Sequence, residues 1–478
     1  MSHEERKAKE EKTAQRSEPG TGGPQGAVQR VLPAHAGSAS SQLAGSRPVS
    51  QGAVKRSDIS GFHKLSPGER VRYVRDFAGL NDEEVEQLKN TGALGMDFAG
   101  HMIENVIGTT QLPMGIATNF LINGRDYLIP MCIEEPSVVA AASHAAKLAR
   151  PGGGFKASST EPVMIGQIQL VNVPEPEEAV KKIIAKRHHM LKVANDQDPT
   201  LVKYGGGARE IEAKIVDSKI IGKMVIVHVL VDCRDAMGAN AVNTMAEALA
   251  PRLEELTGGR ARLRIISNLA VNRTAAAEAI WKKEAIGEEA VQGVVEAYAF
   301  AAADKFRCAT HNKGVMNGVD AVVIATGNDF RAVEAGAHAF AARNGGYKPL
   351  TKYWKDGNGD LHGSIEIPVA VGIVGGAMRS HPIAQIARKI LRLHSARELG
   401  EVLAAVGLAQ NFAALRALST EGIQLGHMRL HAKNFAIAAG AKGEEIDNVT
   451  EEMVKQKTIN TEAAKQLLGE LRKRHNAV

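Results

Sequence analysis

The chain has 478 residues, which predicts two or three domains, and its 44% hydrophobic and 23% charged residues are ordinary for a soluble globular protein. This composition excludes a fibre, a wholly disordered chain and a membrane bundle, because no run approaches the ~18 consecutive apolar residues of a spanning helix. The net charge is +6, but residues 1–57 hold nine Lys/Arg and five Glu, so +4 belongs to them and the remainder is near neutral. We therefore expect no nucleic-acid partner and no membrane partner.

The first 57 residues are rich in Gly, Ser, Ala, Pro and Gln, and we expect a disordered tail because they cannot bury enough apolar surface. They begin with a charged stretch that no apolar segment follows, so no secretory signal is expected. Cys132, Cys233 and Cys308 are odd in number and far apart, which fits neither a disulfide framework nor a zinc site. These features predict a reducing, cytoplasmic location.

Two helix starts open the folded part of the chain. Ser66 stands before a proline and three residues before Glu69, which is the pattern of a capping box. Asn81 precedes three acidic residues and starts the next helix by the same logic, with carboxylates at the positive end of the helix dipole.

Strand-like and helical segments then alternate. The patterns predict strands over 124–132, 163–173 and 223–232, helices over 137–149, 175–195 and 235–256, and a glycine turn over 151–159. Residues 131–267 are therefore expected to form a compact α+β unit.

The second half of the chain is mostly helical. An Ala-rich helix is expected over 288–304, a glycine-punctuated region over 310–376, and helices from there to the end. Within the glycine-punctuated region, the apolar run 321–327 predicts a buried strand that delivers Asp329 at its end. The last ~45 residues form a polar helical appendage of the kind that can move as a lid.

Several ionisable residues stand beside glycine or asparagine in apolar surroundings. Glu104 lies in ENVIG, where a carboxylate is either a candidate general acid or an ordinary partner in an ion pair. Lys313 lies in THNKGVMNG, and with Asp329 it forms either a surface ion pair or a dry cationic site for an oxyanion.

Two further segments suggest ligand contacts. Residues 235–240 (DAMGAN) form a sharp turn before a helix, where backbone N–H groups can hold a phosphate, although no GxGxxG motif is present. His427 and His431 share a helix face, but without a third ligand nearby we expect no metal, and a single histidine would act as a proton donor.

Taken together, these motifs resemble class II 3-hydroxy-3-methylglutaryl-coenzyme A reductase. The resemblance covers roughly residues 60–478 and rests on five motifs in order, which contain Glu104, residues 235–240, Lys313, Asp329 and the GHM of His427, and the block 350–376 also looks like that family. The first 57 residues depart from the pattern.

The resemblance implies a four-electron reduction of 3-hydroxy-3-methylglutaryl-CoA to mevalonate and free CoA, in the mevalonate pathway of isoprenoid biosynthesis. Two NAD(P)H are consumed, by way of mevaldyl-CoA and mevaldehyde, in a reversible reaction without a metal. Lys313 would stabilise the oxyanion, His427 would protonate the CoA thiolate, and Glu104 would supply a proton to mevaldehyde. Asp329 would bridge Lys313 and Glu104.

The family's binding residues carry over to this sequence in the same way. Arg307 would pair with an anionic part of the acyl-CoA and Asn317 would hydrogen-bond the substrate, whereas the cofactor would contact Asp235, Ala236, Met237, Gly238, Asn240 and Asn268.

The implied fold is α/β and α+β. A large substrate-binding domain (58–130 and 268–423) surrounds a long central helix and carries an inserted, ferredoxin-like nucleotide-binding domain (131–267) and a C-terminal helical flap (424–478). The active sites are expected at the interface of an obligate homodimer or an oligomer of dimers.

Some questions stay open at this point. Asn172, Glu175 and Glu177 follow the strand 163–173, where an acidic residue favours NAD, but they do not decide between NAD and NADP. A reductase of another acyl-CoA or aldehyde and a non-enzymatic CoA- or nucleotide-binding protein remain alternatives. The direction of the reaction in the cell is open as well.

Overall fold

The structure is a computed structural model that describes residues 55–92, 94–375, 381–420 and 432–475. The two predicted capping boxes are confirmed. Ser66 caps helix α2 (Pro67–Ala78) with Glu69, and Asn81 caps helix α3 (Asp82–Lys89) with Glu84. A short 3-10 turn, η1 (Phe62–Lys64), precedes them and α4 (Met96–Met102) follows. Residues 1–54 of the expected disordered tail lie outside the described residues. Its last residues, 55–57, are described, and Ser57 is buried and hydrogen-bonded to Asp126, so the predicted boundary at 57 is too late.

A six-stranded sheet forms the centre of the larger part of the fold, in the order β2-β1-β3-β8-β10-β9. Neighbouring strands pair antiparallel, except that β1 and β3 pair in parallel. The strands are β1 (Met114–Ile122), β2 (Arg125–Cys132), β3 (Phe155–Ser159), β8 (Thr274–Trp281), β9 (Thr351–Lys355) and β10 (Leu361–Pro368). The alanines of β8 at 275, 277 and 279 are buried, which allows helices to pack closely against the sheet.

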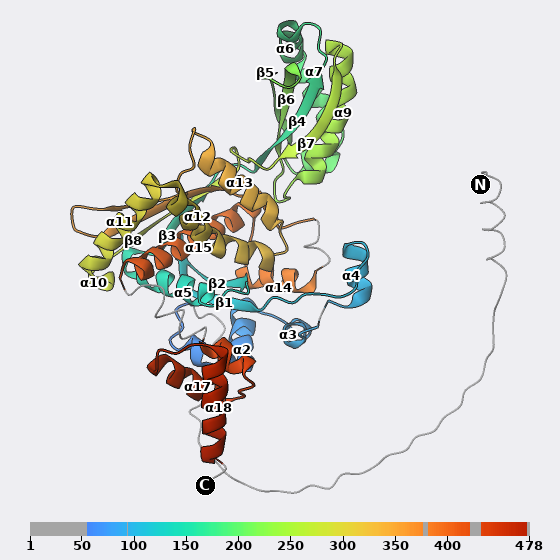
Figure 1. Ribbon diagram of the computed structural model, residues 1–478. Helices are drawn as coiled ribbons and strands as arrows, with labels where there is room; N and C mark the ends of the chain where they lie inside the picture. Colours follow the sequence, from blue (N-terminus) through green and yellow to red (C-terminus); the bar gives the residue numbers. More distant parts are fainter. Residues whose placement is uncertain (1–54, 93, 376–380, 421–431, 476–478) are drawn as a thin grey trace, which may run out of the picture. The chain divides into compact units, whose positions relative to one another are not determined.

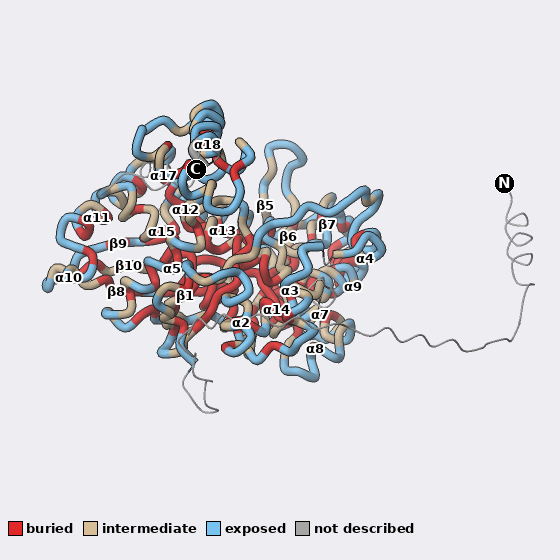
Figure 2. Tube along the Cα trace, turned by 90° about the horizontal axis from the view of Figure 1, so that it is seen from below, coloured by how far each residue is buried: buried red, intermediate tan, exposed pale blue. Residues whose placement is uncertain are grey.

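Helices pack around this sheet and share one apolar core with it (Figures 1 and 2). They are α5 (Val138–Ala149), η2 (Arg150–Gly152), α10 (Lys283–Ile286), α11 (Glu288–Ala303), α12 (Lys305–Ala325), α13 (Phe330–Ala342), α14 (Pro382–Leu391) and α15 (Ala396–Ser419). Among the described residues, α15 alone is long and apolar enough to cross a membrane, but 67% of that apolar window is buried, so α15 is a core helix of this fold.

A second, four-stranded antiparallel sheet has the order β5-β6-β4-β7 and an apolar core of its own. It contains β4 (Val163–Val171), β5 (Gly207–Ser218), β6 (Gly222–Asp232) and β7 (Arg260–Ser267), with helices α6 (Pro176–Ala185), α7 (Arg187–Asn195), α8 (Pro199–Lys203) and α9 (Ala239–Thr257). The fold class is thereby confirmed as mixed α and β.

Three local predictions differ from the structure. The glycine turn expected over 151–159 contains strand β3, which pairs with β8, so residues 131–159 lie with the six-stranded sheet and the second sheet starts only at Val163. The helix expected over 175–195 is two helices that meet at Lys186. Strand β5 was not predicted, although its alternation of charged and apolar residues is a strand pattern, because the three glycines 205–207 were interpreted as a loop.

Near the end of the chain, helices α17 (Glu444–Lys455) and α18 (Thr461–His475) pack together around a small apolar cluster of their own. This pairing fits a helical appendage. The segment 421–431, which contains His427 and His431, lies outside the described residues.

Candidate active site

Helix α12 is the structural base of the candidate site, and it is buried along most of its length. Asp304 caps it by accepting the backbone N–H of Arg307 at 2.7 Å. Inside the core, His311 Nε2 lies 2.6 Å from Thr351 Oγ1, and burial together with Arg307 lowers the pKa of His311 to about 3, so this imidazole is neutral. A neutral histidine held by a hydroxyl fixes α12 against β9 without a buried charge.

One face of α12 is less buried than the remainder of the helix. It carries Lys313, Asn317, Asp320 and Ile324, whose spacing of four, three and four residues places them in one row. The strand predicted over 321–327 is therefore wrong, because residues up to 325 belong to this helix. The apolar run is continuous because the C-terminal half of α12 is buried on several sides, a pattern that a short sequence window does not distinguish from a strand.

Glu135 is a partner of this row that the sequence did not reveal. Its Oε2 atom lies 2.7 Å from Lys313 Nζ and accepts a hydrogen bond from Asn317 Nδ2 at 3.3 Å. Glu135 stands in the turn between β2 and α5, and a carboxylate directly after a buried strand was the signal that could have found it. Lys313, Asn317 and Glu135 together form a polar group that can bind a carbonyl or hydroxyl oxygen.

Asp329 lies beyond the far end of α12 and caps α13. Its Oδ1 atom accepts the backbone N–H groups of Arg331 and Ala332 at 3.1 and 3.2 Å, and it pairs with the Arg331 guanidinium at 3.1 Å. At 1.5 Å per residue, the helix between Lys313 and its last residue spans about 18 Å. The expected bridge from Asp329 to Lys313 is thus not formed within the described residues of one chain.

Glu104 is exposed in a segment without regular structure, 103–113, that follows α4. Among the described residues, no hydrogen bond or ion pair joins it to Lys313 or Asp329, so the expected bridge between the three residues is absent on this side too. Lys313 remains 58% exposed despite its bond to Glu135. One chain therefore leaves this site open to a further group.

The turn 235–238 lies between strand β6 and helix α9, and we call it the cofactor loop because the sequence resemblance predicts cofactor contacts there. Gly238 has φ +104°, and a Cβ there would lie 2.3 Å from the Cys233 sulfur, so only glycine fits. The Asp235 carboxylate accepts the backbone N–H of Ala396, and Asp235 is half-buried. That leaves the backbone N–H groups of the first turn of α9, beside exposed Asn240, as the part of this region able to contact a phosphate.

Buried Arg273 holds the carbonyl side of the cofactor loop. Its guanidinium donates to the carbonyl oxygens of Ala236 and Met237 at 3.0 Å each and to that of Val371. Burial lowers the pKa of Arg273. No residue pattern indicated Arg273, because its role depends on carbonyl groups far away in the chain.

The remaining predicted contacts are distributed around these elements. Arg307 is half-buried in the first turn of α12, and desolvation lowers its pKa. Asn268 follows β7, and its carbonyl oxygen lies so close to α13 that a Cβ on Gly336 would be 2.5 Å away. The structure thus packs Asn268 against the helix that Asp329 caps.

A half-buried carboxyl pair joins the row on α12 to α13. Asp320 interacts with Glu334, whose Oε2 atom lies 2.6 Å from His338 Nε2, and His338 Nδ1 lies 2.7 Å from Tyr347 Oη. Burial and the neighbouring Glu334 raise the pKa of Asp320 to about 9, whereas His338 lowers the pKa of Glu334. One proton therefore stays on the pair at neutral pH.

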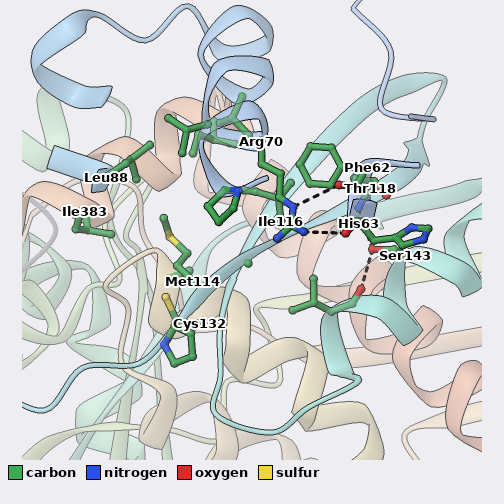
Figure 3. A pocket seen from close by; sticks show the side chains of 18 of the residues that line it. Phe62, His63, Arg70, Leu88, Met114, Ile116, Thr118, Cys132, Ser143 and Ile383 are labelled. Carbon is green, nitrogen blue, oxygen red and sulfur yellow. Dashed lines mark hydrogen bonds between the residues drawn. The ribbon is translucent and has the colours of Figure 1, made fainter. Parts of the chain in front are cut away.

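Figure 3 shows an open cavity of about 1940 Å³. Its lining includes Ile324, which lies on the same face of α12 as Lys313. Its described lining contains one carboxylate, Asp58, and eight basic residues, which are Arg56, His63, Lys64, Arg70, His144, Lys147, Arg150 and His381. A cavity with this balance suits a ligand that carries several negative charges.

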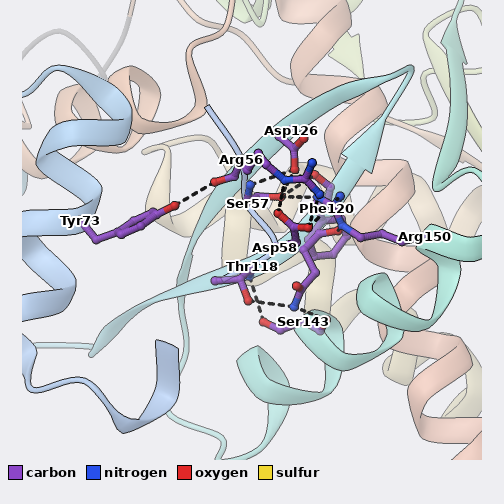
Figure 4. Close-up of polar contacts among 10 residues, drawn as sticks. Arg56, Ser57, Asp58, Tyr73, Thr118, Phe120, Asp126, Ser143 and Arg150 are labelled. Atoms are coloured by element: carbon purple, nitrogen blue, oxygen red, sulfur yellow. Dashed lines mark hydrogen bonds and ion pairs between the residues drawn. The ribbon is translucent and has the colours of Figure 1, made fainter. Parts of the chain in front are cut away.

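The wall of the cavity nearest the start of the described chain is held by an ion-pair cluster (Figure 4). Arg150 pairs with Asp126, Arg56 pairs with Asp58, and buried Ser57 donates to Asp126 Oδ1 at 2.7 Å. These bonds fix the entering chain across strand β1, so two of the eight basic residues serve the fold.

No group of three or more His, Cys, Asp or Glu residues that could hold a metal ion occurs in the described ranges. The ligand-binding potential of the site therefore lies in its cations, its amide and its backbone N–H groups.

Comparison with known proteins identifies relatives of this arrangement. A family model described as hydroxymethylglutaryl-coenzyme A reductase matches residues 66–432. A 3-hydroxy-3-methylglutaryl-coenzyme A reductase of Archaeoglobus fulgidus is 58% identical over 430 residues, which cover 89% of this chain and 98% of that protein. A probable reductase of the same name from Borreliella burgdorferi is 36% identical, with 80% of this chain and 84% of that protein covered.

Solved structures agree with these relatives. A reductase of this name from Streptococcus pneumoniae has a TM-score of 0.74 and 40% identity, and the match covers 86% of this chain and 99% of that one. The class II enzyme from the same organism, bound to NADPH in open conformations, has a TM-score of 0.72 and 41% identity, with 85% and 100% covered.

Proposed function

Because the chain belongs to the hydroxymethylglutaryl-coenzyme A reductase family, we propose that it reduces 3-hydroxy-3-methylglutaryl-CoA to mevalonate with two NAD(P)H. The observation that carries this proposal is the row on α12, where Lys313 and Asn317 meet Glu135 on the helix that also lines the basic cavity at Ile324. A cation and an amide donor on one rigid helix are suited to hold an oxygen that becomes negative.

Lys313, His427 and Glu104 have different roles in the two reductions. Each of the two NAD(P)H molecules, when bound, would supply one hydride, the first for the thioester carbon and the second for the aldehyde carbon. Lys313 stabilises the oxygen that becomes negative each time. When the first adduct collapses, its C–S bond breaks, and His427 protonates the CoA sulfur. Glu104 donates the proton that completes the second reduction.

The basic cavity supports a place for the CoA part of the substrate. Coenzyme A carries three phosphate groups, and the cavity has an excess of cations and a lining that includes Ile324 on the row that carries Lys313. Lys64, Arg70 and Lys147 are the lining Lys and Arg residues outside the ion-pair cluster of Figure 4, and no other role in the fold is assigned to the two lysines. The thioester would then lie toward Lys313 and the phosphates toward these lysines.

The second sheet supports a place for the nicotinamide cofactor, at residues 163–267. The cofactor loop and the start of α9, which includes Asn240, would hold its pyrophosphate through backbone N–H groups.

The three cysteines are buried free thiols, which supports the proposal of a reducing cytoplasmic location.

The activity is tested by following nicotinamide absorbance with 3-hydroxy-3-methylglutaryl-CoA, in parallel with NADH and NADPH. We expect two equivalents of cofactor oxidised for each CoA released. One equivalent for each CoA would point to a reductase that stops at the aldehyde, and no oxidation with either cofactor would contradict the proposed function.

We further propose that two copies of the chain complete each active site. Glu104 lies in the exposed segment 103–113, whose apolar side chains Ile103, Ile107 and Leu112 are 66%, 99% and 41% exposed. Exposed apolar side chains this close together are typical of a surface that another chain covers. Since Lys313 is also exposed, a second copy that brings its own segment would enclose the lysine and supply the carboxylate.

Mixed oligomers test this arrangement. We expect Glu104→Gln and Lys313→Met each to be inactive alone. Co-expression should restore up to about a quarter of the wild-type activity, because half of the two-fold dimers are mixed and one of their two sites is intact. The steady-state rate of cofactor oxidation measures this.

The control pair is Lys313→Met with Asn317→Ala. These residues lie on the same helix face of one chain, so mixing them cannot restore a site. No recovery with Glu104→Gln would show that Glu104 and Lys313 act within one chain. Mixing Asp329→Asn with Lys313→Met decides in the same way which copy supplies Asp329.

Cofactor choice can be tested at the end of β4. Glu177 is paired with Lys223 at 2.7 Å, whereas Glu175 is exposed at the start of α6, two residues beyond buried Val173. An acidic side chain here repels the 2′-phosphate of NADPH and can accept from the 2′-hydroxyl of NADH. We expect Glu175→Gln to raise the ratio of kcat/KM for NADPH to that for NADH by about tenfold. Glu178→Gln on the exposed side of α6 is the control, and an unchanged ratio in both variants would remove Glu175 from cofactor recognition.

A further inference from the structure

Asn328, the residue before Asp329, makes a two-point contact with a distant part of the chain. Its Oδ1 atom accepts the backbone N–H of Gly372 at 2.8 Å, and its Nδ2 atom donates to the Gly372 carbonyl oxygen at 3.2 Å. The same Nδ2 also donates to the hydroxyl of buried Thr326 at 3.1 Å. The amide is therefore held in one orientation and fixes the backbone of Gly372 to the loop that leads into α13.

Gly372 in turn lies directly against the cofactor loop. A Cβ at this position would be 2.5 Å from the Met237 backbone nitrogen and 2.9 Å from the Ala236 carbonyl carbon, so a glycine is needed for the approach. The next two residues, Ile373 and Val374, donate their N–H groups to the Asp235 carbonyl oxygen at 2.8 and 3.3 Å. Residues 372–374 are thus bonded to the cofactor loop on one side and to Asn328 on the other.

Arg273 adds hydrogen bonds to the same connection between this segment and the cofactor loop. It donates to Ala236 and Met237 of the cofactor loop and to Val371, the residue before Gly372. A guanidinium has a fixed planar geometry, so the segment and the loop are held in one relative position. Asp329 is therefore connected to the cofactor loop through the side chain of the preceding residue, Asn328, and through the backbone of residues 372–374.

We propose that Asn328 is a positioning residue, which sets the distance between Asp329 and the cofactor loop through the backbone of Gly372. The inference rests on the proposed function, in which Asp329 belongs to the reacting centre and the cofactor loop to the nicotinamide site. Hydride transfer requires donor and acceptor carbons in close contact, and a small displacement lowers the rate far more than it lowers binding.

The test is Asn328→Ala in the full-length chain, assayed with 3-hydroxy-3-methylglutaryl-CoA and with mevaldehyde. We expect kcat to fall by about tenfold or more in both reactions, whereas KM for NADPH and for the acyl-CoA changes by less than about threefold. With NADPH deuterated at the transferred position, the isotope effect on kcat should rise, because hydride transfer becomes slower than product release.

Asn358→Ala, in the exposed turn between β9 and β10, is the matched control and should leave all three quantities unchanged. Asn328→Asp keeps the shape and the bond from the Gly372 N–H but loses the donation to its carbonyl, so its kcat should lie between those of wild type and Asn328→Ala. If both substitutions prevent folding, Asn328 is a structural residue and the proposal is overturned.

Different results would contradict the proposed function and the positioning role of Asn328. A wild-type protein that does not oxidise cofactor with the acyl-CoA would contradict the proposed function. An active wild type whose Asn328→Ala variant keeps its kcat and its isotope effect, or loses only KM, would overturn the positioning role alone.

Discussion

Lys313→Met should abolish both reductions, with kcat lowered by at least about a hundred- to a thousand-fold for 3-hydroxy-3-methylglutaryl-CoA and for added mevaldehyde. The reason is that each hydride leaves a negative oxygen, and Lys313 is the cation of the row that also holds Asn317 and contacts Glu135. Methionine keeps the length of the side chain and removes the charge. Cofactor oxidation at saturating substrate measures the loss in each reaction.

Two further variants make this expectation specific. Lys355→Met removes an exposed lysine at the end of β9 and should leave both rates unchanged. His427→Gln should impair the thioester reaction but spare mevaldehyde reduction, because only the first reaction releases a thiolate. If Lys313→Met kept mevaldehyde reduction, or if His427→Gln lost it as completely, the assigned division of roles would be wrong.

Asp320→Asn should make the protein more stable at neutral and alkaline pH. The folded chain raises the pKa of Asp320 to about 9 from the ordinary 3.8, because burial and Glu334 both oppose ionisation. Between these values the folded protein holds a proton that the unfolded chain releases, so the free energy of unfolding falls as pH rises. The upper limit of this effect is about 1.4 kcal/mol per pH unit. Asparagine supplies an N–H to Glu334 without binding a proton.

Thermal unfolding between pH 5 and 9 tests this expectation. The melting temperature of Asp320→Asn should exceed that of wild type by an amount that grows with pH across this range. His338, whose pKa Glu334 raises, remains in the variant and still loses its stabilising charge as pH rises. Asp217→Asn on exposed strand β5 should follow wild type at every pH. A constant difference between wild type and Asp320→Asn would show that Asp320 is not protonated in the folded state.

The sequence predicted the helix starts at Ser66 and Asn81 because a capping box depends only on residues three apart. The mixed α and β class followed equally from local periodicity. The apolar run 321–327 misled the prediction, because helix and strand residues look alike when every side of the element is buried. Strand β3 was missed because its place is decided by pairing with β8, about 120 residues further along the chain.

For the candidate site too, the sequence motifs predicted some features and the tertiary structure decided others. Motif resemblance drew attention to Glu104, Lys313 and Asp329, and the family membership that it implied is confirmed. The motifs did not reveal which side chains are in contact. In the structure Lys313 contacts Glu135, and Asp329 caps a helix of the same chain. The contacts of Arg273 and Asn328 are with backbone atoms, which every residue has, so no residue pattern announces them.

By itself the sequence determined the family, the chemical types available for the reaction and the helix boundaries that short-range bonds specify. Only the tertiary structure decided that Glu135 is the partner of Lys313, that Asp320 keeps its proton, and that Gly372 joins Asn328 to the cofactor loop. The physical reason is that partners, burial and close approach depend on segments distant in the chain. Chemical type and local hydrogen bonding are properties of the residues and their nearest neighbours.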